Sequence, residues 1–198
     1  MSSSADTRFP ALVFKGLHVG PAGWSYPDWN GIVYPAERPR GWHALDWLSC
    51  YFNLCEINTS FYRIPSVDSA RSWVRRVAGH PDFLFTAKVW EGFTHSGMRA
   101  GMAGYSKSDV SAFCAFADVL HTAGRLGCLL LQFPWSFRPT PENRDCLAAL
   151  ADAFSVYPLA VEVRHQAWHT PEWLEWLRVR QIAFVNIDQP LFSGSLPP

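Results

Sequence analysis

Six short apolar runs, separated by segments with helical periodicity, constrain the fold of this chain more than any other feature. The runs are rich in β-branched and aromatic residues, and they lie at Leu17–Gly20, Leu54–Asn58, Phe83–Val89, Leu126–Phe133, Leu159–Arg164 and Ile182–Asp188. Successive runs start roughly 23 to 43 residues apart, which is the length of a strand-helix unit. The pattern predicts an α/β protein with six βα units and parallel strands.

The segments between the runs carry helix signals. Two of them space their apolar residues for one buried stripe, at Val67, Ala70, Val74 and Val77 and at Val110, Phe113, Ala117 and Leu120. Ser66 and Ser108 occupy expected N-cap positions, and Thr140-Pro141 and Thr170-Pro171 place a capping hydroxyl before a proline. Gly124 suits a helix C-terminus. Further helices fit Trp42–Phe52 and Glu142–Phe154.

Polar residues inside the runs distinguish between two folds that share this alternation of strands and helices, a doubly wound sheet and a barrel. They occur two residues apart, and therefore on one face of a strand, at Glu56/Asn58, Thr86/Lys88, Glu162/Arg164 and Asn186/Asp188. Strands of a doubly wound sheet are apolar on both faces because helices cover both. A barrel turns one face of every strand to its interior. The pattern favours a TIM-type (β/α) barrel over a doubly wound sheet.

The length of the chain conflicts with a complete barrel. Such a barrel needs eight strands and about 250 residues, whereas this chain has 198 residues and six runs. We expect an N-terminal extension at 1–16, a barrel domain at 17–188 that lacks its last two units, and a tail at 189–198. The chain is then either a fragment, which we favour, or an open barrel whose edge strands another chain covers.

Composition narrows the possible partners and the compartment. Hydrophobic residues make up 48% of the chain and charged residues 17%, which excludes a disordered protein. A formal net charge of zero gives no support for a nucleic-acid partner. The five cysteines show no metal-ligand spacing and indicate free thiols in a reducing compartment. Without a signal peptide or a membrane-spanning run, we expect a soluble cytoplasmic protein, and its oligomeric state stays open.

The polar residues of the runs are also the candidate functional residues, because active sites of barrels form at the carboxyl ends of the strands. Glu56, Glu162 and Lys88 are the candidate catalytic residues. The candidate substrate-binding residues are Trp24, Asn58, Tyr62, Gln132, Arg164 and Asp188, and His95 follows on a loop. Carboxylates, cations and amides together suit acid/base chemistry or a polar, polyhydroxylated or anionic ligand.

Simpler roles compete with catalysis. The charged residues could neutralise one another as a buried network, since buried charges must be paired. A divalent metal is disfavoured, because the imidazoles of His95, His165 and His169 are poorly placed and Lys88 and Arg164 would repel a cation. We therefore expect neither a metal nor a cofactor. The glycine-rich segment Glu91–Ser106 indicates a mobile lid or a spacer.

Five segments, in this order and spacing, resemble the DUF72 family, also called YecE-like proteins. They are GWSYPDWNGIVYP, EINTSFYRIP, FLFTAKVWEGFTH, LGCLLLQFPWSF and AVEVRHQAWH, and the similarity spans about residues 17 to 190. The resemblance implies a TIM-type barrel that continues beyond this chain with further strands. It implies no reaction, because the family is labelled as one of unknown function.

These observations lead to one functional hypothesis and its alternatives. We expect a TIM-barrel enzyme that acts on a small polar or sugar-like substrate by carboxylate acid/base chemistry, with Glu56 and Glu162 as the pair. The alternatives are a non-catalytic barrel that binds a ligand, a nucleic acid or a protein, and a metal-dependent hydrolase or isomerase.

Overall fold

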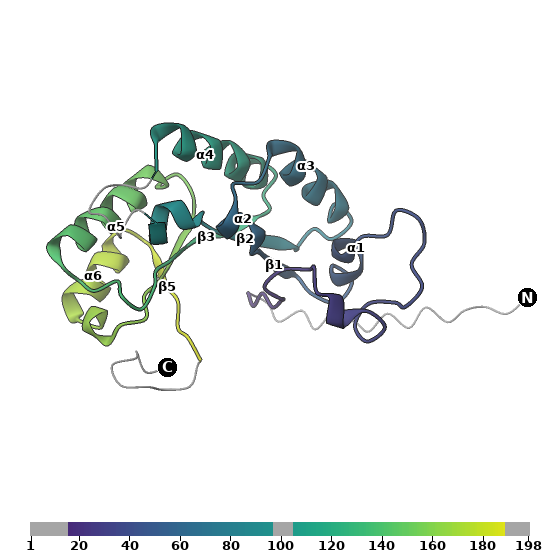
Figure 1. The fold of residues 1–198 in the computed structure, drawn as a ribbon, viewed down its shortest axis with the longest axis horizontal. Helices are drawn as coiled ribbons and strands as arrows, with labels where there is room; N and C mark the ends of the chain where they lie inside the picture. Colours follow the sequence, from purple (N-terminus) through teal and green to yellow (C-terminus); the bar gives the residue numbers. More distant parts are fainter. Residues whose placement is uncertain (1–15, 97–104, 189–198) are drawn as a thin grey trace, which may run out of the picture.

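The computed structural model describes residues 16–96 and 105–188, which form an α/β fold around one parallel sheet (Figure 1). Five strands lie in the sheet in chain order, with each strand beside the next. Their bounds are β1 Leu54–Ile57, β2 Leu84–Lys88, β3 Leu126–Gln132, β4 Leu159–Glu162 and β5 Ala183–Phe184. All four strand pairs are parallel. The predicted α/β class and the parallel strands are therefore confirmed.

Helices connect the strands. The longer ones are α3 Val67–Arg76, α4 Lys107–Thr122, α5 Pro141–Ala153 and α6 Pro171–Val179. The shorter ones are α1 Ala44–Leu48, α2 Thr59–Tyr62, the 3-10 helices η1 Pro27–Trp29 and η4 Gln166–Trp168, and the π-helix η2 Gly92–Ser96. The helix predicted at Trp42–Phe52 is thus shorter than expected.

Local capping sets where the long helices begin. Ser66, Thr140 and Thr170 each accept a hydrogen bond from a backbone N–H in the first turn, as the sequence predicts. The prediction for α4 is wrong by two residues. Ser106, and not Ser108, is the N-cap, because Ser106 and Asp109 form a reciprocal capping box.

The two faces of the sheet differ in what covers them. Helices α3 to α6 pack on one face (Figure 1), and that face supplies the main core with residues such as Ile57, Phe85, Leu129 and Val161. The alternate residues of β1 and β2 are half-buried and point to the other face. In β1 and β2, burial on one face only is the arrangement that the same-parity polar residues predict, whereas β4 is buried on both faces.

The first predicted strand, Leu17–Gly20, is not a strand in the structure, although it runs along β1. The Asn53 side chain accepts a hydrogen bond from Val19 N at 2.8 Å and donates one to the carbonyl oxygen of Leu17 at 3.0 Å. Glu56 N donates to the carbonyl oxygen of Pro21 at 3.0 Å. A side-chain amide thus takes the place of part of the backbone ladder, which explains why the strand prediction fails here.

The sheet does not close into a barrel within residues 16–96 and 105–188. Strands β1 and β5 each pair with a single strand. The last predicted strand, Ile182–Asp188, is reduced to Ala183–Phe184. Five strands, rather than six units of a barrel, are therefore observed. The predicted extension, except for residue 16, and the predicted tail lie outside the described residues, as do residues 97–104 of the predicted lid.

Among the helices of the described part of the chain, none is long and apolar enough to cross a membrane.

Candidate functional site

Glu56 and Lys88 form an ion pair at the carboxyl ends of β1 and β2. The Lys88 Nζ atom lies 3.6 Å from Glu56 Oε1, and the two side chains are only 19% and 18% exposed. The alternation of both strands places these side chains on the face that the long helices leave open. The pair joins two of the three predicted catalytic residues.

The Glu56 carboxyl group is electrostatically perturbed. Burial raises its pKa above the ordinary value of 4.5, and the negative charge of Glu162 raises it further. The neighbouring Lys88 ammonium lowers it, but burial is the largest influence. A carboxyl group with a raised pKa retains a proton at higher pH than an ordinary glutamate does, which is a property of general acids.

Glu162 is held by two donors at the end of β4. Gln132 Nε2 donates to Glu162 Oε1 at 2.6 Å, and Arg164 Nε donates to the same oxygen at 2.9 Å. Gln132 and Glu162 are register partners in the β3–β4 pair, so the sheet itself fixes their proximity. The Glu162 side chain is 9% exposed and that of Arg164 39%. The carboxylate is therefore oriented before any ligand arrives.

Five predicted residues thus lie at one end of four adjacent strands. They form two groups, Glu56 with Lys88 and Glu162 with Gln132 and Arg164. The two groups interact electrostatically, because the negative charge of Glu162 raises the pKa of Glu56. We call these five residues the carboxylate cluster. It combines a protonatable carboxyl group, an oriented carboxylate and two cations, which is a set of groups able to transfer protons and bind an anionic oxygen.

Three predicted binding residues share a pocket whose lining includes no member of the carboxylate cluster. Asn58 does not share a strand face with Glu56, because β1 ends at Ile57 and Asn58 begins α2 in a helical conformation. Asn58, Tyr62 and Trp24 instead line one small pocket of about 120 Å³. The Tyr62 side chain is 67% exposed.

Asp188 and His95 are not part of the carboxylate cluster. Asp188 is exposed and lies four residues beyond the end of β5, and no hydrogen bond or ion pair within the described residues links it to the cluster. His95 belongs to the π-helix η2, where its Nδ1 atom lies 2.9 Å from the Thr94 hydroxyl oxygen. Its ring packs edge-on against Phe61, with 4.9 Å between centroids.

Sequence reasoning missed two residues beside the carboxylate cluster. Cys128 lies on β3 in register with Thr86, and burial raises the pKa of its thiol to about 11, with a contribution from the Glu56 charge. Ser60 is fully buried, and its hydroxyl lies 2.6 Å from the carbonyl oxygen of Lys88. The shared strand parity of Cys128 and Gln132 was the available signal for the cysteine, whereas Ser60 gave none.

The aromatic loop that precedes α1 largely packs on itself. Tyr34 is buried, and its ring contacts those of Trp29 and Trp42. The Arg38 guanidinium lies 4.3 Å from the centre of the Trp42 ring. A hollow of about 390 Å³ remains beside these rings.

Metal-ligating side chains do not converge in residues 16–96 and 105–188, where no three His, Cys, Asp or Glu residues are placed to hold an ion. All five cysteines are free thiols.

Comparison with known proteins places the chain in a family. The family described as "Protein of unknown function DUF72" matches residues 18–197. A curated relative, the UPF0759 protein YunF of Bacillus subtilis, is 27% identical over 190 residues. The match covers 91% of this chain and 64% of YunF, so the chain spans slightly less than two thirds of that relative.

Solved structures agree with this assignment. A DUF72 family protein of Thermotoga maritima is 34% identical with a TM-score of 0.74, and the match covers 91% of this chain and 68% of that one. A DUF72 family protein of Enterococcus faecalis is 25% identical with a TM-score of 0.68, over 78% of this chain and 62% of the other. The sequence and the fold therefore agree that this chain belongs to the DUF72 family of proteins of unknown function.

Proposed function

We propose that this protein is an enzyme that acts on a small polar or sugar-like substrate by carboxylate acid/base chemistry. The observation that supports the proposal is the presence of two carboxyl groups in different environments at the same end of the sheet, Glu56 on β1 and Glu162 on β4. Burial raises the pKa of Glu56, whereas two donors hold Glu162 in one orientation. Two carboxyl groups in contrasting environments are a recurrent arrangement in acid/base catalysis.

The proposed roles follow from these contacts. Glu56, whose pKa is raised by burial, takes up a proton and donates it to a leaving or carbonyl oxygen as the general acid. Both donors to Glu162 end at Oε1, which leaves Oε2 to accept a proton from the substrate or from water. Lys88, at 3.6 Å from Glu56, stabilises negative charge that develops during the transfer.

The proposal extends to the fold. We infer that the parallel strands are part of a TIM-type barrel whose interior face carries the carboxylate cluster. Strand order equal to chain order supports this inference, and so does the restriction of the long helices to one face. The carboxyl end of such a barrel is where enzymes of this fold place their active sites.

The test is a turnover screen of the full 198-residue protein with aryl glycosides, aldoses and sugar phosphates, with products identified by NMR. The variants are Glu56→Gln and Glu162→Gln, and the control is Glu175→Gln, whose side chain is 56% exposed in a pair with Arg178. Each cluster variant is expected to lose about a hundredfold or more in turnover, and the control is expected to lose nothing. Unchanged turnover in both cluster variants contradicts the proposal.

A different result would identify the alternative function. Saturable binding of a panel compound without turnover, abolished by Tyr62→Ala and not by Glu56→Gln, would replace catalysis with ligand binding at the pocket of Trp24, Asn58 and Tyr62.

A further inference from the structure

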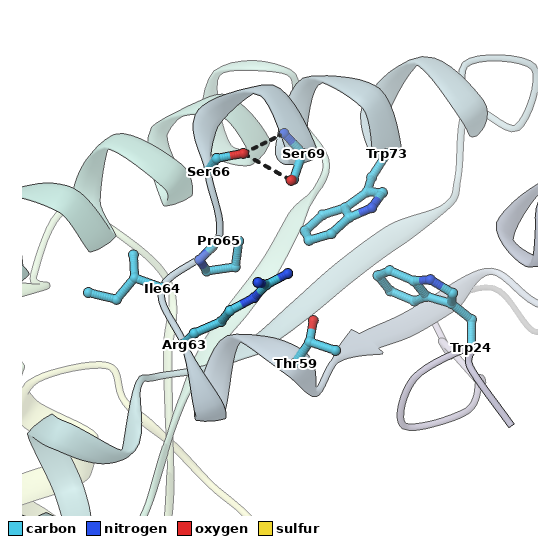
Figure 2. A pocket seen from close by; sticks show the side chains of 8 residues that line it. All are labelled: Trp24, Thr59, Arg63, Ile64, Pro65, Ser66, Ser69 and Trp73. Atoms are coloured by element: carbon cyan, nitrogen blue, oxygen red, sulfur yellow. Dashed lines mark hydrogen bonds between the residues drawn. The ribbon is translucent and has the colours of Figure 1, made fainter.

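A larger pocket than the two described above lies outside the carboxylate cluster. It is enclosed by Trp24 of the aromatic loop that precedes α1, by α2 and by the beginning of α3 (Figure 2). Its volume is about 410 Å³, which lies within the usual range for small-molecule sites. The residues that line it are Trp24, Thr59, Arg63, Ile64, Pro65, Ser66, Ser69 and Trp73. No member of the carboxylate cluster is among them. We call this cavity the Arg63 pocket.

Two indoles form the apolar wall of the Arg63 pocket. The rings of Trp24 and Trp73 meet edge-to-face with 5.2 Å between centroids. Trp73 is supported from behind by Phe116 of α4, at a centroid distance of 6.3 Å. Both indoles are only half-buried, so ring surface stays available to a ligand. A rigid, partly exposed aromatic wall suits a planar apolar group.

The guanidinium of Arg63 provides the opposite side of the pocket. Figure 2 shows this side chain extending from α2 toward the two indoles. Within residues 16–96 and 105–188, no carboxylate or carbonyl oxygen pairs with it. Other arginines nearby are occupied, since Arg71 pairs with Asp68 at 3.2 Å and Arg76 with Asp46 at 2.7 Å. The Asp68 carboxylate is thereby neutralised.

Two of the three hydroxyl groups that line the pocket, those of Ser66 and Ser69, are engaged at the beginning of α3. Ser66 Oγ already accepts from Ser69 N at 3.1 Å as the N-cap of α3, and it lies 2.9 Å from Ser69 Oγ (dashed lines in Figure 2). Arg63 alone carries a charge among the residues that line the pocket, so its guanidinium favours anionic ligands.

We propose that the Arg63 pocket binds a small organic anion that carries a planar apolar ring, with the ring against Trp24 and Trp73 and the anionic group at Arg63. The anionic group is a carboxylate or a phosphate, because each presents two oxygen atoms that can accept the two parallel N–H groups of a guanidinium. The site is independent of the function proposed for Glu56 and Glu162.

The test uses three probes that share one ring, namely 1-naphthoate, 1-naphthyl phosphate and the neutral 1-naphthamide. Binding to the full chain is followed through the indole N–H signals of Trp24 and Trp73 in nitrogen-15 NMR spectra, assigned with Trp24→Phe and Trp73→Phe. The altered protein is Arg63→Gln. The matched control is Arg75→Gln, which removes the same charge from exposed Arg75 on α3, outside the pocket.

At least one anionic probe is expected to shift both indole signals and to bind about tenfold tighter than 1-naphthamide. Arg63→Gln is expected to remove that difference, and Arg75→Gln to preserve it. The stronger of the two anions identifies carboxylate or phosphate as the preferred group. Equal affinity of anions and amide for the unaltered protein overturns the proposal, as does an unchanged preference in Arg63→Gln or an absence of shifts at Trp24 and Trp73.

Discussion

Lys88 on β2 reaches diagonally to Glu56 on the neighbouring strand β1. The register partner of Glu56 is Thr86, yet the Lys88 Nζ atom two residues further along β2 lies 3.6 Å from Glu56 Oε1. The pairing depends on the length of the lysine side chain and on the parallel alignment of β1 and β2. The carboxylate cluster is therefore a product of the sheet register as much as of residue type.

Substitution of Lys88 by an uncharged residue should destabilise the protein, because the Glu56 carboxylate is mostly buried. We expect Lys88→Met to lower the free energy of unfolding by about 1 to 2 kcal/mol at neutral pH, because Glu56 then lacks its counter-charge. It should also raise the pKa of Glu56, which carbon-13 NMR of the carboxyl group measures. Arg71→Met, which breaks an exposed pair with Asp68, should change stability by less than about 0.5 kcal/mol. Equal effects of both substitutions would contradict this account of Glu56.

The raised pKa of Glu56 predicts a pH dependence of stability. Between the unfolded value near 4.5 and the higher folded value, the folded state binds more protons than the unfolded state. The Glu56 contribution to stability is therefore greatest below pH 4.5 and declines as pH rises through the folded pKa. Urea unfolding of the unaltered protein and Glu56→Gln across this range should show their stability difference shifting in favour of the variant as pH rises. A difference that is independent of pH would refute the prediction.

Replacing Gln132 with glutamate should destabilise the protein, because a second carboxylate would then face Glu162. We expect Gln132→Glu to destabilise the protein by about 2 kcal/mol or more at neutral pH, because the donor at 2.6 Å becomes a like charge. The loss should shrink at pH 4, where one carboxyl group is protonated, as thermal unfolding at both pH values would show. Gln166→Glu makes the same change at an exposed position in η4 and should leave stability within about 0.5 kcal/mol.

Gly20 should be irreplaceable for steric reasons. A Cβ atom at this position would lie 1.7 Å from the carbonyl oxygen of Leu54, and neither backbone can move aside easily. We expect Gly20→Ala to cost about 3 kcal/mol or more in unfolding free energy. Gly79→Ala places its Cβ in open space and should be neutral or slightly stabilising. A stable Gly20→Ala protein would mean that residues 17–21 do not pack against β1 as described.

The start of α4 offers a direct comparison of two serines. Ser106 Oγ accepts a hydrogen bond from Asp109 N at 3.2 Å, so Ser106→Ala should cost about 1 kcal/mol. Ser108→Ala should cost less than about 0.5 kcal/mol, because Ser108 caps no backbone group in α4. Chemical unfolding of both variants measures the difference. The reverse order would restore Ser108 as the cap.

Several features could be predicted because they depend on local chemistry. The periodicity of the runs located the starts of all five strands of the described residues to within one residue and predicted their parallel pairing. Matched parity predicted that Glu56, Lys88 and Glu162 share a face, and the ion pair of Glu56 with Lys88 and the effect of Glu162 on the pKa of Glu56 agree with it. The same argument was wrong for Asn58, which begins α2. The strand at Leu17–Gly20 was wrong because the Asn53 side chain replaces backbone pairing there, which no periodicity records.

Asn58 and Arg63 show most clearly which features the sequence could not predict. By itself the sequence determined the α/β class, the order of its elements and the family, and it named the five residues of the carboxylate cluster within a larger set of candidates, because strand alternation and capping act over a few residues. Only the tertiary structure decided that β1 stops before Asn58, and that Arg63 shares a pocket with Trp24 and Trp73. The physical reason is that a pocket arises where segments distant in sequence fail to fill the space between them, and that volume depends on how whole elements pack.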